Sequence, residues 1–325
     1  MLSDAASTTA PEKPGNVDEF IEEFAGDCRL RGMTPYSVHS YMSALRSLRN
    51  HLESKGIHDI AKVDKEALRD YIRVLREERK LSMSTIENHL SSISGFFDYL
   101  VYEEIVEANL ALLVRKRYLR RYKSDGPGDA HSRKLITTEQ LKALVESALV
   151  PRDKAVILLL AKTGVRRGEL VTIDLNDVDP VQGKITLKPK AKRSNRVVFF
   201  DEECGRALQD WLSVRGRYAT KDSTALFVTS GGGRLDKNGV YNIVTGHAKV
   251  VGLHNPDSDR LEDHFTPHCL RHWFTTYLRR NGMPREMVQE LRGDVRWEAI
   301  DIYHHIDEEE LRRAYLAAIP KLGIE

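Results

Sequence analysis

The sequence predicts a mainly α-helical protein of two domains, with a small β-sheet in the second. Three observations support this fold class: apolar residues recur at helical spacing along most of the chain, a basic segment broken by Gly126-Pro127-Gly128 interrupts that spacing, and two short β-type runs occur only after the break. The length of 325 residues agrees with two domains, because a domain has about 150 residues on average.

Residues 16–110 are predicted to form a helical domain. The preceding residues, 1–15, are rich in Ser, Thr, Ala and Pro, a composition typical of a disordered leader. Over 17–105 the apolar residues fall on helical faces in four segments, and Thr34-Pro35 opens the second of them. The candidate N-caps of the third and fourth segments are Asp64 and Ser82 or Ser84. We therefore expect a four-helix bundle.

Residues 111–134 are predicted to be a basic linker. They carry 8 basic and 2 acidic side chains. Residues 1–110 carry 13 basic and 19 acidic side chains, and residues 135–325 carry 29 basic and 27 acidic ones. The formal net charge of +2 therefore hides a positive centre. Tyr118 and Tyr122 lie among the basic residues, which favours a segment that contacts phosphates over a solvated hinge. The candidate DNA-binding residues are Arg115, Lys116, Arg117, Arg120, Arg121 and Lys123.

Residues 135–325 are predicted to form the second domain, which is mostly helical. The apolar run Ala155 to Ala161 is typical of a buried helix. Two strands are expected at 184–187 and 197–200, joined by the basic turn 189–196. Further helices are expected at 205–214, 237–251, 269–281, 285–292 and 308–318.

Charge, hydropathy and cysteine count exclude several classes of protein. No apolar run approaches the ~18 residues that a bilayer requires, and the first residues lack the basic and apolar regions of a signal peptide. The three cysteines, Cys28, Cys204 and Cys269, are far apart and form no CxxC pair, which argues against a disulfide framework and a zinc ribbon. We expect a protein of the reducing cytoplasm, without membrane contact.

Four segments of the second domain carry residue types suited to phosphate chemistry. They are TGVRRGEL at 163–170, KPKAKRSNR at 188–196, TPHCLRH at 266–272 and IYHH at 302–305. In the first, an apolar helix stops at Gly164 and the next begins with Arg166, a cation that opposes the helix dipole and is therefore expected to have an anionic partner. In the third, Pro267 suits the first helical position, and His268 and Arg271 share one face.

Together and in this order, these segments resemble the tyrosine recombinase (phage integrase, Xer-like) family, in which TGxRxxEL, a strand-turn Lys, HxxR and a late Tyr form one active site. The resemblance covers residues 17–320. It implies a two-domain DNA clamp, in which a SAM-like helical core-binding domain is linked to a catalytic domain. It also implies an enzyme that cuts and rejoins DNA through a 3′-phosphotyrosine intermediate.

The resemblance extends to partners and setting. It implies strand exchange on double-stranded DNA without ATP, a metal or any other cofactor. The active assembly would be a homotetramer on two DNA sites, with residues 308–324 packed on a neighbour, and a monomer or dimer without DNA. The implied host is a prokaryote, a virus or a mobile element, and the implied location is the cytoplasm.

The family's site residues carry over onto matching positions of this chain. The resemblance implies Tyr303 as the nucleophile, Arg166 and Arg271 as ligands of the scissile phosphate, and His268 as an assisting residue. Attack on a phosphodiester builds negative charge on two oxygens, which planar guanidiniums meet with paired hydrogen bonds. Two further residues are expected to support the site, His272 by hydrogen bonding from one helical turn below and Glu169 by an ion pair or a cap.

Two positions leave alternatives. The lysine that would protonate the 5′ leaving group is Lys190 by alignment on the following strand, with Lys192 as the alternative. Asp294, nine residues before Tyr303, stands where the family usually has His or sometimes Trp, and an ionised carboxylate would repel a phosphate. We favour an Asp294 that turns away and buttresses a basic residue such as Arg292 or Arg296; the alternatives are a protonated carboxyl or an impaired protein.

Other functions also fit part of the pattern. His268 and His272 have the spacing of zinc ligands, but Cys269 stands where a zinc protease has Glu, so no metal site is predicted. A type IB topoisomerase uses the same residue types, although the TGxRxxEL and HxLRH forms argue against it. A non-catalytic DNA-binding protein on the same scaffold is supported by Asp294.

Overall fold

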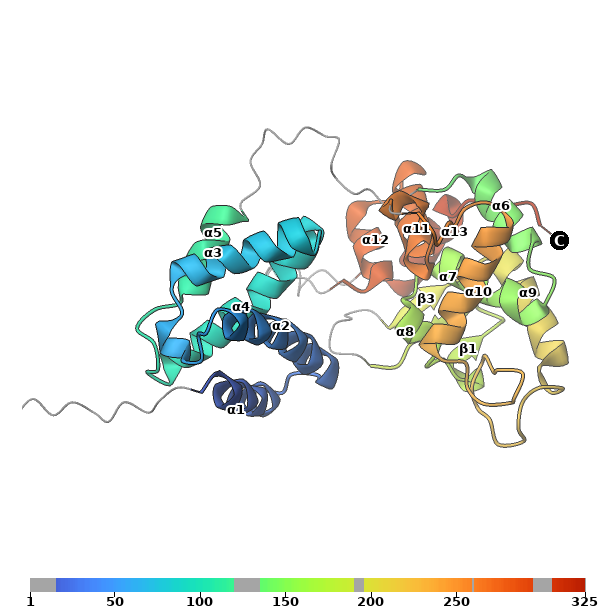
Figure 1. The fold of residues 1–325 in the computed structure, drawn as a ribbon. Coiled ribbons are helices and arrows are strands. Elements are labelled where there is room, and N and C mark those ends of the chain that lie inside the picture. Colours follow the sequence, from blue (N-terminus) through green and yellow to red (C-terminus); the bar gives the residue numbers. More distant parts are fainter. Residues whose placement is uncertain (1–15, 120–134, 190–195, 259, 295–305, 325) are drawn as a thin grey trace, which may run out of the picture. The chain divides into compact units, whose positions relative to one another are not determined.

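The computed structural model describes residues 16–119, 135–189, 196–258, 260–294 and 306–324. The chain divides into two compact units, residues 1–129 and 130–325. The described part is mainly helical, and its one named sheet lies in the second unit. The predicted fold class is confirmed (Figure 1).

The first unit contains five described α-helices around one apolar core. They are α1 (Val17–Leu30), α2 (Pro35–Ser54), α3 (Lys65–Arg73), α4 (Met83–Tyr102) and α5 (Leu110–Tyr118), with a 3₁₀ turn at Ile60–Lys62 and a π-helical turn at Val74–Glu78. Thr34, Asp64 and Ser82 each accept a backbone N–H at the start of a helix, so the N-caps expected from the sequence are present. Phe24, Leu45 and Phe96 are completely buried at the centre of the unit.

Helix α5 lies at the start of the predicted linker. Residues 111–118, read from composition as linker, are helical, with Ala111 and Val114 buried in the core of the first unit. Asn109 caps the helix by accepting the N–H of Leu112 at 2.8 Å. Arg115, Lys116 and Arg117 make the end of this helix basic, but the two apolar positions three residues apart bury one face of it, and this burial stabilises the helix.

The second unit is built around a central buried helix. In order, its α-helices are α6 (Thr138–Glu146), α7 (Pro151–Thr163), α8 (Arg167–Leu170), α9 (Glu202–Arg215), α10 (Lys237–Val250), α11 (Pro267–Arg280), α12 (Arg285–Arg292) and α13 (Glu308–Ala318), with 3₁₀ turns at Leu175–Asp177 and Leu261–Asp263. Every residue of α7 from Ala155 to Thr163 is buried, and α9, α10 and α11 all contact it (Figure 1). This burial explains why the run from Ala155 to Ala161 is apolar on all sides.

The sheet of the second unit is small and antiparallel. Its strands are β1 (Val178–Asp179), β2 (Lys184–Thr186) and β3 (Val197–Phe199), in the order β1-β2-β3. Ile185 pairs with Val178 on one side and Val198 on the other, and its side chain is completely buried. The two strands expected from the sequence are therefore present, and β1, with only two residues, is an addition.

The C-terminal residues pack onto the unit to which they belong. Leu311 and Tyr315 of α13, followed by Ile319, Leu322 and Ile324, are buried in the core of the second unit. In this single chain the segment thus packs on its own domain, and its packing on a neighbouring copy stays a prediction. No helix in the described part of the chain is long and apolar enough to cross a bilayer.

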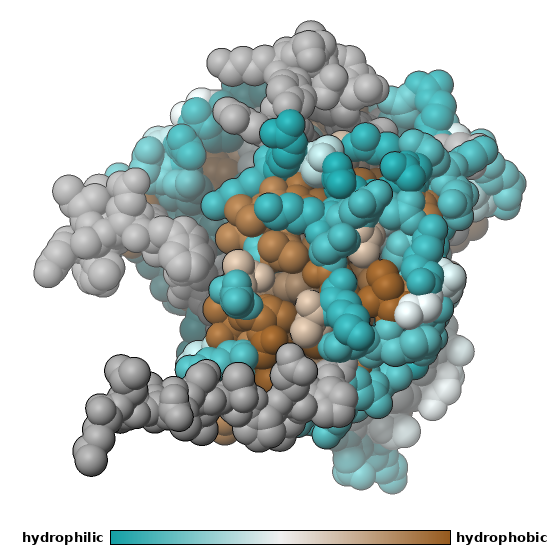
Figure 2. Space-filling view, turned by 60° about the vertical axis from the view of Figure 1, so that its left-hand side comes forward, coloured by the Kyte–Doolittle hydropathy of each residue, from teal (hydrophilic) through white to brown (hydrophobic). Residues whose placement is uncertain are grey.

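The surface carries exposed hydrophobic side chains as well as charge. Figure 2 shows one face on which hydrophobic residues form a patch bordered by hydrophilic ones. Among the described residues, the most exposed large hydrophobic side chains are Leu30, Leu149 and Val181. Bordered patches of this kind are typical of surfaces that partners cover.

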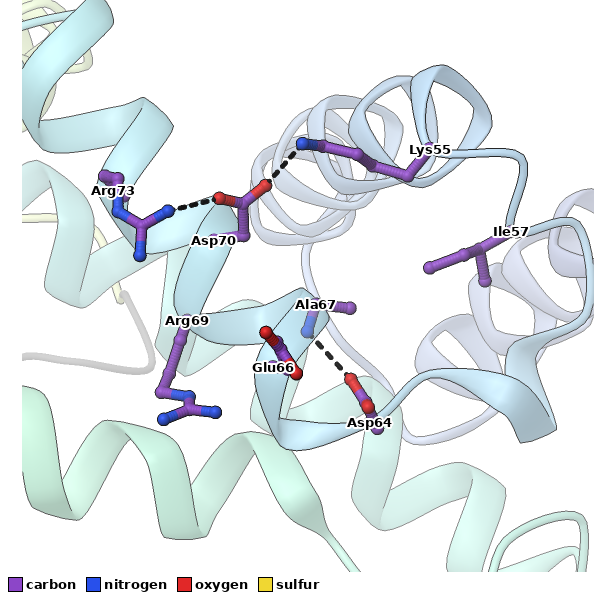
Figure 3. A pocket seen from close by; sticks show the side chains of 8 residues that line it. All are labelled: Lys55, Ile57, Asp64, Glu66, Ala67, Arg69, Asp70 and Arg73. Atoms are coloured by element: carbon purple, nitrogen blue, oxygen red, sulfur yellow. Dashed lines mark hydrogen bonds and ion pairs between the residues drawn. The ribbon is translucent and has the colours of Figure 1, made fainter.

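A polar hollow lies beside α3 in the first unit (Figure 3). Asp70 lies between Lys55 and Arg73, and each of these cations is 2.8 Å from one of its carboxylate oxygens. The hydrogen bond from Lys55 lowers the pKa of Asp70. Because these charges are paired within the protein, we assign no ligand to the hollow.

Candidate active site

The end of helix α7 is fixed by a glycine. Gly164 adopts a left-handed conformation with φ of 62° and ends the helix. A Cβ atom on Gly164 would lie 2.4 Å from Cδ1 of Phe274. The carbonyl oxygen of Gly164 accepts a hydrogen bond of 2.6 Å from Nη1 of Arg271. The glycine of the TGVRRGEL segment therefore brings α7 and α11 into close contact.

Gly164→Ala is expected to lower the free energy of unfolding of the second unit by about 2 to 5 kcal/mol, because left-handed strain adds to the clash with Phe274. The measurement is denaturant unfolding followed by tryptophan fluorescence, since Trp211 and Trp273 are buried in this unit. Gly246→Ala, in the open middle of α10, is the control and should be neutral or slightly stabilising. Equal unfolding midpoints for both variants would contradict the assignment.

Arg166 lies at the start of α8 and has the anionic partners expected from its position. Its backbone N–H donates to Oε2 of Glu169 at 2.7 Å, and its Nη1 donates to Oε1 at 3.1 Å. Glu169 is buried, whereas the side chain of Arg166 is 41% exposed. Glu169 thus acts both as cap and as ion-pair partner, and it holds a guanidinium that solvent and ligands can still reach.

Arg271 comes from α11, where Thr266 is the N-cap residue and Pro267 the first helical residue. Its side chain is 5% exposed and donates to two backbone oxygens, that of Gly164 from Nη1 and that of Arg292 from Nη2, the latter at 3.0 Å. Burial lowers the pKa of Arg271 to about 10, and the neighbouring Arg166 and Arg292 act in the same direction. The guanidinium stays protonated at neutral pH.

Asp294 joins the two arginines. Its Oδ1 accepts from Nη2 of Arg166 and from Nη2 of Arg271, each at 3.3 Å, and its Oδ2 lies 3.1 Å from Nε of Arg292. Gly293, in the left-handed conformation with φ of 61°, ends α12 and turns the chain toward this position. Asp294 therefore contacts Arg292, one of the basic residues named from the sequence, but the expectation that it turns away from the site was wrong, because it also contacts Arg166 and Arg271.

The remaining predicted residues divide into three groups. His268 and His272 are exposed on α11, and the support expected from His272 stays a prediction. Arg115, Lys116 and Arg117 lie on α5 of the first unit, the last two exposed. Outside the described residues lie Tyr303, Lys190, Lys192, Arg120, Arg121, Lys123 and Arg296.

The base of the basic turn is fixed by an aspartate that the sequence reasoning did not single out. Asp174 pairs with Lys188, just after β2, and with Arg234, and it accepts from Thr224 at 3.1 Å. Hydrogen bonds from Arg234 and then Lys188 lower the pKa of Asp174 to about 2. Lys188 therefore anchors the turn and is not part of the arginine cluster.

A second missed group is a buried lysine at the end of α7. Nζ of Lys162 donates to Asp201, Glu203 and the carbonyl oxygen of Pro320, each at 2.6 Å. Oε1 of Glu203 in turn accepts the backbone N–H groups of Leu322 at 2.9 Å and Gly323 at 2.7 Å. A lone lysine directly after the apolar run was the only sequence signal for this group, which attaches the C-terminal residues to the core.

Among the described residues, no group of three or more His, Cys, Asp or Glu side chains is arranged to hold a metal ion. The cluster that stands out is instead one of arginines. Three guanidiniums, of Arg166, Arg271 and Arg292, surround the carboxylates of Glu169 and Asp294, which leaves one positive charge in excess. Such a cluster can bind an anion with oxygens spaced like those of a phosphate.

Comparison with known proteins gives consistent matches to both units. Residues 134–310 match the model of the phage integrase family, and residues 20–107 match that of the phage integrase N-terminal SAM-like domain. The chain is 30% identical to tyrosine recombinase XerC of Thermodesulfovibrio yellowstonii over 313 residues, which cover 92% of this chain and 96% of that protein.

Solved structures show the same fold. A lambda integrase (75–356) dimer bound to a COC′ core site has a TM-score of 0.68 at 15% identity, covering 88% of this chain and 99% of that one. A lambda integrase tetramer bound to a Holliday junction has a TM-score of 0.67 at 16% identity, covering 88% and 80%.

Proposed function

The chain belongs to the phage integrase family of tyrosine recombinases, enzymes that cleave and rejoin DNA, and on this premise we propose that it is a site-specific recombinase with Tyr303 as its nucleophile. One observation carries the proposal: the guanidiniums of Arg166 and Arg271 converge on a single acceptor oxygen. Two such donors are what a pentacoordinate phosphate requires, since negative charge grows on its non-bridging oxygens.

The reaction proceeds by two exchanges at phosphorus. The hydroxyl of Tyr303 loses its proton to water as its oxygen attacks the scissile phosphate and forms a 3′-phosphotyrosyl bond, while the 5′ oxygen leaves and takes a proton from Lys190, or from Lys192 in its place. A 5′-hydroxyl of a partner duplex then reverses the step. Because the covalent intermediate conserves the bond energy, neither ATP nor a metal ion is needed.

The described residues have distinct parts in this scheme. Arg271 is held by two backbone oxygens and is the fixed ligand of the phosphate, whereas the more exposed Arg166 completes the pair. His268, exposed on the same helix as Arg271, assists at the phosphate. Glu169 keeps Arg166 in place, and thus serves as a positioning residue.

We assign residues 16–110 to the core-binding domain, 111–134 to the linker and 135–325 to the catalytic domain, with the helical start of the linker joined to the first unit. The partners are double-stranded DNA and further copies of the chain, as a tetramer on two DNA sites, or a monomer or dimer without DNA. We propose a cytoplasmic location in a prokaryotic host.

Tyr303→Phe is expected to bind the target duplex with unchanged affinity and to form no covalent adduct. The substitution removes only the attacking oxygen, so the phosphate ligands stay in place. The measurement is gel analysis of a nicked suicide duplex, which traps the adduct of the wild-type protein because the released strand diffuses away. The target itself is first found by selecting bound and cleaved sites from random DNA. An adduct that persists in the variant would refute Tyr303 as the nucleophile.

Neutralising the basic segment should flatten the salt dependence of DNA binding. With Gln at Arg115, Lys116, Arg117, Arg120 and Arg121, the slope of log K against log salt concentration should fall by roughly one unit for each phosphate that these side chains neutralise in the wild type. Binding is measured by fluorescence anisotropy at several salt concentrations. An unchanged slope would show that these residues are solvated and touch no phosphate.

A non-catalytic DNA-binding protein is the second candidate, because Asp294 occupies the arginine pair. Single-turnover cleavage by the wild type and by Asp294→His separates the two. A wild type that cleaves supports the recombinase, whereas cleavage by the variant alone supports the binder.

A further inference from the structure

We propose that the carboxylate of Asp294 is an internal competitor of the scissile phosphate: it occupies the Arg166–Arg271 pair in the DNA-free protein and is displaced when the phosphate enters. The inference deepens the proposed function and rests on it, because it takes the arginine pair as the phosphate site. Asp294 thereby becomes a residue that sets how strongly a backbone phosphate must bind before it reaches the site.

The geometry of Asp294 is that of a bound anion. A single oxygen, Oδ1, bridges the terminal nitrogens of two guanidiniums that come from different helices, at equal distances of 3.3 Å. A non-bridging phosphate oxygen held by both arginines would have to accept from the same nitrogens. Because each N–H donates along one direction, the carboxylate and the phosphate cannot both have these hydrogen bonds.

Charge also favours displacement over a shared site. A phosphodiester and a carboxylate are both negative, and side by side they would repel each other in a partly buried place where water screens poorly. The side chain of Asp294 is 31% exposed and that of Arg166 41%, so an incoming anion can reach the contact between them. Arg271, at 5%, stays fixed by its two backbone acceptors.

Asp294 has another cation to which it can turn. Its second oxygen lies 3.1 Å from Nε of Arg292, two residues earlier in the chain. Since this contact does not involve the arginine pair, the carboxylate can keep a charged partner after the phosphate has taken Oδ1's place. Displacement therefore leaves no isolated charge, and the cost is the exchange of one set of charge-assisted hydrogen bonds for another.

The consequence is a threshold for phosphate entry. A ligand that binds only the unoccupied form of a site has its apparent affinity reduced by the fraction of the protein in that form. A phosphate at an arbitrary position on DNA is bound weakly, whereas a phosphate in a target sequence that both domains contact is bound more tightly. The competitor lowers the affinity for both by the same factor, so at concentrations where the target nearly saturates the site it reduces occupancy by other DNA more than occupancy by the target.

Inorganic phosphate is the first probe, because its binding needs neither a target sequence nor Tyr303. The unfolding temperature of the second unit is followed against phosphate concentration, with sodium chloride holding the ionic strength constant, and the dissociation constant is taken from the shift. Asp294→Asn should bind phosphate about tenfold more tightly than the wild type, the scale of one charge-assisted contact that is partly screened. Asp294→Ala is the second variant and should give the same result.

Glu286→Gln is the matched control, since it removes one exposed carboxylate from the neighbouring helix, α12. It should leave phosphate binding near the wild-type value. Phosphate binding by Asp294→Asn and Asp294→Ala that is no tighter than that of Glu286→Gln would overturn the inference. Weaker binding by both would overturn it as well, because it would show that the carboxylate positions the arginines.

Cleavage of the selected duplex separates this inference from the proposed function. At sub-saturating DNA, Asp294→Asn should cleave faster than the wild type and Glu286→Gln at the wild-type rate, whereas a slower Asp294→Asn would overturn the inference. Tighter phosphate binding by Asp294→Asn without any adduct in any variant would refute the recombinase and leave the competition standing. A wild-type adduct, together with phosphate binding that is unchanged in Asp294→Asn, would support the recombinase and refute the competition.

Discussion

Lys162→Met is expected to destabilise the second unit by about 3 to 5 kcal/mol, the usual cost of removing one partner from a buried ion pair. The lysine is completely buried, and its removal leaves the carboxylates of Asp201 and Glu203 without their cation. It also frees the carbonyl oxygen of Pro320, so the C-terminal residues should detach first. Urea unfolding followed by tryptophan fluorescence measures the loss, and proteolysis reports the detached segment.

Lys221→Met, on an exposed loop, is the control and should unfold like the wild type.

The pH dependence of stability provides a further check. Burial alone would raise the pKa of Glu203, but hydrogen bonds from Lys162 and from the N–H of Leu322 outweigh it and lower the pKa. A lowered pKa means that the contribution of Glu203 is present above its unfolded pKa and is lost as the pH falls through the folded one. A Lys162→Met protein as stable as the control would contradict the arrangement.

Arg271→Lys is expected to reduce single-turnover cleavage by at least about 10² to 10³-fold, because a preorganised donor to the transition state is lost. The change retains the charge but not the planar fork, which serves Gly164, Arg292 and Asp294 from two nitrogens. Since a lysine cannot reach both backbone oxygens in the same geometry, stability should fall as well. Cleavage is measured on the suicide duplex and stability by urea unfolding.

Arg166→Lys is the informative companion variant. The side chain of Arg166 is 41% exposed, and its partners are side-chain carboxylates rather than backbone oxygens. Cleavage should therefore fall by a similar factor while stability changes little. Arg285→Lys, exposed on α12, should alter neither. If Arg271→Lys retained wild-type cleavage, Arg271 would not be a ligand of the phosphate.

Local pattern predicted most of the fold. Apolar spacing predicted α7 and α9 to α13 near their observed bounds. A helix that is buried on one face, or on all faces like the apolar run of α7, shows this burial in the pattern of its own residues. Helix α5 was missed because composition there is basic and only Ala111 and Val114 are buried. Strand β1 was missed because two residues are too few to show alternation.

The resemblance placed Arg166 and Arg271 in one site, but the contacts of Asp294 with them and of Lys162 with the C-terminal residues could not be predicted from one sequence. That Arg166 needs an anion follows from its position at a helix start, and Glu169 is close enough in the chain to be named. Asp294, 128 residues away, is brought to it by the packing of α11 on α7 and of α12 on α11. The same is true of Lys162 and the residues at 320–323, whose partnership depends on the path of the C-terminal segment.

The end of helix α7 leaves four consecutive positions with almost no freedom to vary. Lys162 is committed to its two carboxylates, Thr163 donates to the carbonyl oxygen of Leu159 and accepts from the N–H of Val165, Gly164 has no room for a side chain, and Val165 is 1% exposed. Each position meets a different physical demand, so a change at one cannot be compensated by a change at the next. A substitution at any of these four positions is therefore expected to cost stability unless distant parts of the domain change with it.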